Sequence, residues 1–260
     1  MTVSSDPSVA IVSRLRAAGC VFAEDEAALL VSATGDAAEL EAMIERRVSG
    51  EPLEYVLGWA SFRGLRIAVD PGVFIPRRRT EFLVAEALRV TAPGAVVVDL
   101  CCGSGALGAA VAAEQRVSLH AADIELPSVR CAERNLAASQ GAVYQGDLYD
   151  ALPAELRGRI DVLLANVPYV PTEEIRLLPA EARLYEPVVT LDGGPDGLRL
   201  LERVAADATE WLAPGGHVFA EVSERQAPLA REVFVEHGLV AELAVDDELG
   251  ANVVRGTYLG

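Results

Sequence analysis

The first part of the chain has apolar residues at helical spacing. Between Ser5 and about Glu51 the sequence is rich in Ala, Leu, Glu and Arg, and apolar residues recur three and four positions apart, as in Leu40-x-x-Met43-Ile44. Such a pattern predicts amphipathic helices packed as a small bundle. We therefore expect residues 1–56 to form an N-terminal helical domain.

A different pattern follows between Trp59 and Gly72. Two short runs rich in apolar residues flank Arg63-Gly64, which predicts a β-hairpin with its turn at these two residues. We expect residues 57–75 to link the helical domain to the remainder of the chain.

Beyond Val73, runs rich in β-branched residues alternate with helical stretches. This alternation predicts an α/β fold class, with a doubly wound, Rossmann-like parallel sheet over residues 76–260. Two strands around a polar loop would close the sheet as an antiparallel hairpin. The expected strands are 96–100, 117–122, 142–145, 160–165, 216–222, 240–245 and 253–260, and the expected helices include 106–115 and 127–138.

Composition and charge narrow the class of protein. With 51% apolar residues and acids spread along the whole chain, the sequence has ample material for a core and no sign of disorder. The net charge of −17 disfavours a nucleic-acid partner, because phosphate binding normally needs a basic face. We see no signal-peptide region and no apolar run of bilayer length, so we expect a cytoplasmic protein without a membrane partner.

The cysteines and histidines suggest no metal site. The cysteines have no C-x-x-C spacing, and the adjacent pair would form a strained disulfide, so we expect reduced thiols. The histidines are scattered along the chain, and we assign them no catalytic or metal role. These residues are Cys20, Cys101, Cys102 and Cys131, and His120, His217 and His237.

A glycine-rich turn follows the strand expected at 96–100. Gly103 and Gly105 lack Cβ atoms, so the turn can take positive φ and a ligand can approach the main chain closely. Doubly wound sheets bind ligands at the carboxyl ends of their strands, near the point where strand order reverses. A plain dinucleotide site is disfavoured, because Cys101 stands where the G-x-G-x-x-G pattern has its first glycine.

Acidic residues follow the next two strands. Asp123 comes about 20 residues beyond the turn, the spacing at which an acid binds ribose hydroxyls. The alternative is that Asp123 only caps the helix expected at 127–138. Asp147 and Leu148 come after the strand 142–145, where an acid and an apolar side chain would flank an adenine ring.

The most specific chemical feature is Asn166-Val167-Pro168-Tyr169, which ends the apolar run 160–165. A planar sp2 nitrogen is a poor nucleophile because its lone pair is delocalised, so a site that alkylates it must orient it. The Asn166 side-chain oxygen and the Val167 carbonyl would accept its two N–H hydrogens, and fixing the reacting atoms can lower a barrier by roughly 7–11 kcal/mol. Pro168 would keep Val167 extended, and Tyr169 would offer a flat face. The alternative is an ordinary Asn-x-Pro turn, with Tyr169 as core filler.

In their order along the chain, these motifs resemble the release-factor glutamine methyltransferases, the HemK/PrmC family. The segment 47–58 is similar to the family's R-x-x-G-x-P-x-x-Y-x-x-G motif, and 74–81 is similar to its I-P-R-P-x-T-E motif. Later blocks follow in the same order, namely Tyr185-Glu186-Pro187, Gly193-Gly194-x-Asp196-Gly197-Leu198 and Pro214-Gly215-Gly216. The similarity covers nearly the whole chain.

The resemblance implies a class I S-adenosylmethionine-dependent methyltransferase fold and S-adenosylmethionine as the cofactor. The implied substrate is the glutamine of a Gly-Gly-Gln loop in a peptide-chain release factor, methylated at its side-chain nitrogen. The N-terminal domain would either dock that protein or only cap the fold. The implied catalytic residues are Asn166, Val167, Pro168 and Tyr169, and the implied cofactor-binding residues are Asp99, Cys101, Cys102, Gly103, Ser104, Gly105, Asp123, Asp147, Leu148 and Asn166.

The chain departs from the family pattern in three places. Val167 replaces the first proline of Asn-Pro-Pro-Tyr, a change that a contact through the backbone carbonyl tolerates. Cys101 replaces a glycine, which suggests a divergent paralogue whose backbone there keeps φ negative. Arg78 and Arg79 replace a proline and an acid. We expect these two arginines, with Arg77, to pair with the abundant acids, the alternative being an anionic partner.

Two other functions are compatible with the sequence. The Asn-x-Pro-Tyr geometry also serves the exocyclic amines of adenine, cytosine or guanine, as in nucleic-acid methyltransferases. A non-catalytic paralogue that binds S-adenosylmethionine is the second alternative, and Cys101 and Val167 are its only support.

Overall fold

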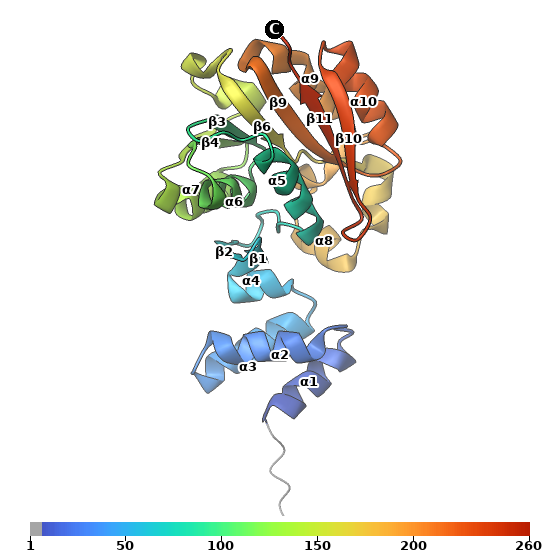
Figure 1. Ribbon diagram of the computed structural model, residues 1–260. Helices are drawn as coiled ribbons and strands as arrows, with labels where there is room; N and C mark the ends of the chain where they lie inside the picture. The colour runs from blue at the N-terminus through green and yellow to red at the C-terminus, as the bar shows by residue number, and fades with distance from the viewer. Residues whose placement is uncertain (1–6) are drawn as a thin grey trace, which may run out of the picture.

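The computed structural model describes residues 7–260. Its first four helices form a unit at one end of the molecule (Figure 1), and they share a core that includes Leu15, Leu30 and Ile44. Asp36 caps the third helix, because its side chain accepts the backbone N–H of Glu39 at 2.8 Å. The expected helical unit is therefore present, although residues 1–6 of the predicted domain lie outside the described residues. The helices are α1 (Pro7–Ala17), α2 (Ala23–Ala33), α3 (Ala37–Val48) and α4 (Leu53–Leu57).

A β-hairpin follows, formed by β1 (Trp59–Phe62) and β2 (Leu65–Ala68). Its turn is Arg63-Gly64, as expected, and φ is +46° at Arg63 and +75° at Gly64. Two consecutive residues with positive φ are typical of the turn whose twist matches that of the flanking strands. Phe62 and Ile67 are buried in a core of the following α/β unit and not in the helical core. The hairpin therefore packs as part of the larger unit.

The larger unit is built on a seven-stranded sheet of order β10-β11-β9-β6-β3-β4-β5. The strand order reverses at β3, which has β4 on one side and β6 on the other, so a doubly wound sheet is confirmed. The antiparallel terminal pair is also confirmed, and β9 begins at Leu212, earlier than predicted. The parallel strands are β3 (Val96–Leu100), β4 (Ser118–Asp123), β5 (Ala142–Gln145), β6 (Ile160–Ala165) and β9 (Leu212–Val222), and the antiparallel ones are β10 (Val240–Asp246) and β11 (Ala251–Thr257).

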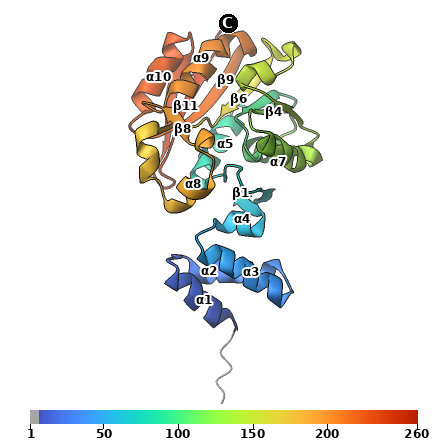
Figure 2. The same cartoon turned by 180° about the vertical axis from the view of Figure 1, so that it is seen from behind.

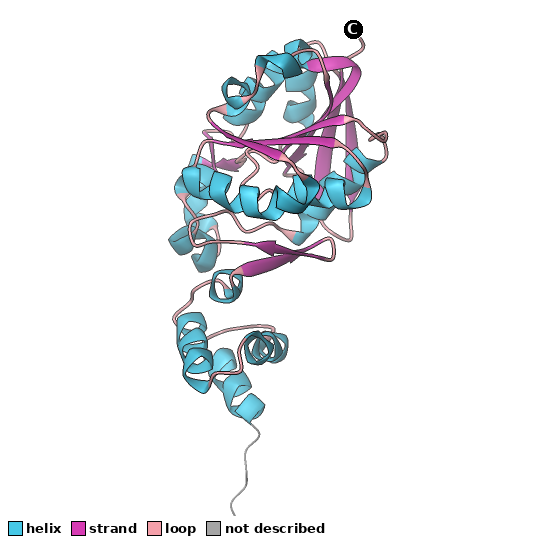
Figure 3. Ribbon diagram, turned by 90° about the vertical axis from the view of Figure 1, so that its left-hand side faces the viewer, coloured by secondary structure: helices cyan, strands magenta, loops and turns pink. Residues whose placement is uncertain are grey.

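Helices cover both faces of this sheet (Figures 2 and 3). Three of them share a core with Val97 of β3, and the other two share a core with Val98. Neighbouring residues belong to different cores because successive side chains of a strand point to opposite faces. Burial on both faces explains the nearly continuous apolar runs in the sequence. The helices are α5 (Glu81–Leu88), α6 (Ala106–Glu114) and α7 (Leu126–Leu136) on the first face, and α9 (Arg199–Trp211) and α10 (Ala227–Glu236) on the second.

The connection from β6 to α9 carries additional short elements that the sequence analysis did not anticipate. They are β7 (Val170–Pro171), α8 (Ala180–Tyr185) and β8 (Asp192–Gly194), of which β7 and β8 pair in parallel. Within residues 7–260, no helix combines the length and the apolar character that a membrane crossing requires. Turns of 3-10 helix occupy Arg78–Thr80, Ala137–Ser139, Leu148–Ala151, Ala154–Leu156, Thr172–Leu177 and Val188–Thr190.

Candidate active site

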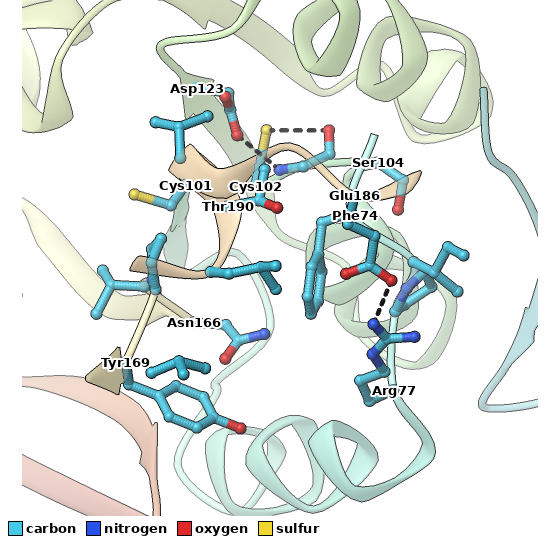
Figure 4. A pocket seen from close by; sticks show the side chains of 18 of the residues that line it. Phe74, Arg77, Cys101, Cys102, Ser104, Asp123, Asn166, Tyr169, Glu186 and Thr190 are labelled. Atoms are coloured by element: carbon cyan, nitrogen blue, oxygen red, sulfur yellow. Dashed lines mark hydrogen bonds and ion pairs between the residues drawn. The ribbon is translucent and has the colours of Figure 1, made fainter. Parts of the chain in front are cut away.

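A cavity of about 1020 Å³ lies where β3, β4 and β6 end, beside the point where strand order reverses. In Figure 4, Asp123 and the glycine-rich turn lie at one end of this pocket, and Asn166 and Tyr169 lie at the other. Most of the residues singled out from the sequence line it, namely Cys101, Cys102, Gly103, Ser104, Asp123, Asp147, Leu148, Asn166, Val167, Pro168 and Tyr169. Asp99 and Gly105 do not line it, and both residues are buried.

The turn after β3 corrects one expectation. Cys101 has φ of +54°, in the left-handed region, whereas the sequence analysis expected a negative φ. A residue with a Cβ atom loses roughly 1–2 kcal/mol there. The turn imposes this conformation, since the next residue, Cys102, donates its N–H to Ala122 of the neighbouring strand at 3.1 Å. The geometry of the turn therefore outweighs the local preference of the residue.

Gly105 serves helix packing. Its φ is +75°, and a Cβ atom on it would lie 3.1 Å from the Cβ of Ala132 in α7. Gly105 therefore lets α6 begin in close contact with α7.

Asp99 is buried below the turn. Its Oδ2 accepts the backbone N–H of Gly108 in α6 at 2.9 Å, so the carboxyl group fixes the first turns of that helix. Burial raises the pKa of Asp99 to about 8, although the bond from Gly108 acts in the opposite direction. The nearby carboxylate of Asp123 raises it further.

Asp123 joins the end of β4 to the glycine-rich turn. One carboxylate oxygen accepts the N–H of Gly103 and the other accepts the N–H of Glu125, each at 2.9 Å. The N-cap position of α7 belongs to Glu125, so Asp123 does not have the capping position considered above. Burial raises the pKa of Asp123, against the effect of these two hydrogen bonds.

Asp147 and Leu148 follow β5 and form another wall of the cavity. Asp147 pairs with Arg203 of α9 at 2.8 Å. Leu148 is buried and has φ of +49°, an unusual conformation for a leucine. The left-handed residue turns the chain sharply after β5.

Asn166 presents a buried acceptor without a partner. Its side-chain oxygen Oδ1 is inaccessible to water and has no hydrogen-bond partner among the described residues. A buried polar atom of this kind is destabilising by about 1–3 kcal/mol. Val167, the next residue, is 2% exposed, so the motif enters the core directly after the asparagine. An unpartnered acceptor beside a cavity is what a site for an N–H donor requires.

Two glycines pack closely against the backbone that follows Asn166. A Cβ atom on Gly193 would lie 2.7 Å from the carbonyl oxygen of Pro168, and one on Gly197 would lie 2.2 Å from that of Tyr169. Gln226 adds a hydrogen bond from its Nε2 to the Tyr169 carbonyl at 2.8 Å. The motif at residues 193–198 therefore packs directly against the Asn166–Tyr169 segment. No local pattern in the sequence pointed to Gln226.

The hydroxyl group of Tyr169 is fixed by an ion pair. It donates to Oε1 of Glu221 at 2.7 Å and accepts from Nη2 of Arg79 at 2.6 Å. Arg79 also bonds Glu221 through its Nε at 3.0 Å. Burial and the charge of Glu221 raise the pKa of Tyr169, so its hydroxyl stays protonated. Glu221 was not recognised from the sequence, because it lies in a buried strand far along the chain.

A second ion pair faces the cavity. Arg77 pairs with Glu186, and its guanidinium lies 5.0 Å from the centre of the Phe74 ring. Figure 4 shows one oxygen of Glu186 toward Arg77 and the other turned away from it. Burial raises the pKa of Glu186, and Arg77 opposes that effect. The expected pairing with acids is thus confirmed for Arg77 and Arg79, whereas Arg78 forms no ion pair with the described residues.

Within residues 7–260 no group of three or more His, Cys, Asp or Glu side chains is arranged to hold a metal ion. The four cysteines are free thiols in the structure.

The fold and the position of the cavity define a class I S-adenosylmethionine-dependent methyltransferase. A family model described as the methyltransferase small domain matches residues 64–184. Among curated relatives, the release factor glutamine methyltransferase of Geobacter sulfurreducens is 35% identical over 223 residues, which cover 84% of this chain and 77% of that protein. The release factor glutamine methyltransferase of Streptomyces coelicolor is 36% identical over 212 residues, which cover 80% of this chain and 75% of that protein. The chain belongs to the release factor glutamine methyltransferase family.

Solved structures show the same fold at lower identity. A methyltransferase from Pyrococcus furiosus has a TM-score of 0.57 and 16% identity, and the match covers 76% of this chain and 90% of that one. The ribosomal protein L11 methylase of Lactobacillus delbrueckii has a TM-score of 0.55 and 18% identity, with coverages of 75% and 86%.

Proposed function

We propose that this protein transfers a methyl group from S-adenosylmethionine to the side-chain amide nitrogen of a glutamine in the Gly-Gly-Gln loop of a peptide-chain release factor. The unpartnered Oδ1 of Asn166 at the cavity wall carries this proposal, because it is an acceptor in need of an N–H donor. Family membership supports the same substrate, since the curated relatives are named release factor glutamine methyltransferases.

The residues at the turn end of the cavity fit the cofactor. The backbone from Cys101 to Ser104 approaches the cavity without bulky side chains, and Asp123 is the acid that would hold ribose hydroxyls. Leu148 and Asp147 would contact the adenine ring from the wall after β5. Asp99 and Gly105 would act indirectly, by fixing the turn and its helix. When bound, S-adenosylmethionine supplies a methyl group on a positively charged sulfur.

The residues at the Asn166 end fit an amide. Asn166 Oδ1 would accept one N–H of the substrate glutamine, and the Val167 carbonyl would accept the other. Tyr169 would contact the planar amide with its ring, which its hydroxyl bonds keep in place. These residues bind and orient the nitrogen, and no base is needed for that task.

The ion pairs make a nucleic-acid substrate less favourable. Arg77 and Arg79 are engaged with Glu186 and Glu221, so neither offers its full charge to a phosphate. The protein as a whole carries a net charge of −17.

The proposal is tested by transfer of labelled methyl from S-adenosylmethionine to a purified release factor. The matched control substrate has Gly-Gly-Glu in place of Gly-Gly-Gln. We expect label on the glutamine substrate alone. Cofactor binding without label on either substrate would refute the proposed acceptor, and equal label on both would place the methylated residue elsewhere.

A further inference from the structure

The cavity is walled on one side by the segment 172–190, which contains α8. Its residues Glu181, Ala182 and Glu186 line the cavity, together with neighbours on either side. Within this segment, all of which the structure describes, only Ala182 and Glu186 are buried. Large apolar side chains such as Leu177 and Leu184 are about two-thirds exposed, at 68% and 69%. A segment with so little buried surface depends on its polar contacts for its position.

Three carboxylates of the 172–190 segment are each held by an arginine. Glu174 pairs with Arg225, which lies two residues before the start of α10, and Glu186 pairs with Arg77, which precedes α5. Both of these arginines belong to the α/β unit. The third pair is formed by Glu181 and Arg47 at 2.6 Å, and Arg47 belongs to α3 of the N-terminal helical unit. Figure 1 shows α8 at the end of the α/β unit that faces those helices.

Arg47 is anchored independently of Glu181. Its Nε and Nη2 bond both carboxylate oxygens of Glu26 in α2, at 2.6 and 3.1 Å. Its Nη1 also donates to the carbonyl of Glu51 at 3.1 Å. The side chains of Arg47 and Glu26 are 8% and 11% exposed, whereas that of Glu181 is 47% exposed. The guanidinium thus stays fixed within the helical unit, and Glu181 is the partner that can be removed without leaving a buried charge alone.

We propose that Arg47 is a positioning residue that couples the N-terminal helical unit to the cavity wall through Glu181. The inference rests on the proposed function and extends it, because the coupled wall would set how the acceptor protein enters the cavity. Through Arg47, the helical unit and α8 present one continuous surface to that protein, and Glu174 lies outside α8. Loss of the pair then weakens binding of the acceptor protein and leaves cofactor affinity unchanged.

The test compares Glu181→Gln with Glu174→Gln. Each substitution removes one charge from the same segment, but only the first breaks the link to the helical unit. For Glu181→Gln we expect KM for the release factor to rise roughly fivefold, with kcat and cofactor affinity changed by less than about twofold. For Glu174→Gln we expect no change in KM beyond about twofold.

A second measurement follows the coupling itself. Fluorophores attached through unnatural amino acids at Val21 and Val235, which are 82% and 60% exposed, report the distance between the two units in single molecules. Glu181→Gln should broaden that distance distribution, and Glu174→Gln should leave it as in the wild type. Identical distributions and KM values for both variants would overturn the proposal, as would a fall in kcat with KM unchanged. If the wild type methylates no release factor, the proposed function fails, and the distance distributions still decide whether Arg47 couples the two units.

Discussion

Asn166→Ala should separate stability from activity. Asn166 Oδ1 is buried without a hydrogen-bond partner, so its removal takes away a group that is destabilising by about 1–3 kcal/mol. Part of this gain is offset by lost packing, and we expect a net change between zero and about +1 kcal/mol. For a chain of this size that corresponds to a melting temperature that is unchanged or raised by about 2–4 °C.

Activity should change in the opposite direction. If Asn166 orients the reacting nitrogen, loss of its acceptor should lower kcat by about 10²–10³, the range found for single preorganised hydrogen-bonding groups in active sites. The assays are thermal unfolding and methyl transfer to the release factor, on the same preparations.

Asn135→Ala is the matched control for the stability arm. Asn135 is half-buried like Asn166, but its amide bonds the main chain at Ala68 and Ser104, at 2.8–2.9 Å. Its truncation should therefore lower stability by about 1–3 kcal/mol. The reasoning is refuted if Asn166→Ala destabilises the protein as much as Asn135→Ala does. Activity within about tenfold of the wild type would refute the orienting role.

Three further predictions concern the groups around the site. Because folding raises the pKa of Asp99 from 3.8 to about 8, its contribution to stability is present in full below about pH 4 and is lost as pH rises through 8. In urea unfolding at several pH values, the free energy of unfolding of Asp99→Asn should decline less steeply over this window than that of the wild type. The same decline in both proteins would contradict the raised pKa. Gly197→Ala would place a Cβ atom 2.2 Å from the Tyr169 carbonyl and should lower the free energy of unfolding by about 2 kcal/mol or more. Gly215→Ala, at a similar φ but with open space around it, should lower it by only about 1 kcal/mol in denaturant unfolding. Equal losses of stability would argue against the close approach at Gly197. Arg79→Ala leaves the buried Glu221 without its ion-pair partner and should lower both methyl transfer and the melting temperature. The expected loss of stability is about 1–2 kcal/mol after allowance for the half-exposed arginine, whereas Arg78→Ala should change stability by less than about 0.5 kcal/mol. Thermal unfolding in which the two variants behave alike would contradict this account.

Local pattern was enough to predict the elements of the sheet. Ile160–Ala165 and Ala142–Gln145 are strands with the predicted limits, because short runs of mostly apolar residues between turns have few other conformations open to them. The hairpin turn at Arg63-Gly64 was predictable for a similar reason. The short strands β7 and β8 were missed, since two or three residues give no periodicity to detect.

The missing parts of the site are contacts between distant residues. Tyr169 meets Glu221, which is 52 positions away, and Arg47 meets Glu181, which is 134 positions away. No local spacing encodes such pairs, although the arginines at 77 and 79 did suggest that acids would be near. At Cys101 a local rule gave a wrong prediction. The rule predicted negative φ, whereas the hydrogen bonds of the turn impose positive φ.

The hydrogen-bonding groups that have partners, and the one at Asn166 that has none, indicate how the site positions its substrate. The Tyr169 hydroxyl has two partners, its carbonyl is bonded by Gln226, and the glycines at 193 and 197 leave no room for the backbone to shift. Beside this fixed framework, Asn166 keeps an open acceptor at a net loss of stability. A site that depended on a strong base would need a group free to take a proton there. Asn166, Val167 and Pro168 carry no such group, and the Tyr169 hydroxyl stays protonated and donates to Glu221. Rigid support around the unsatisfied Asn166 acceptor is instead the arrangement expected when positioning of the substrate nitrogen supplies most of the rate enhancement.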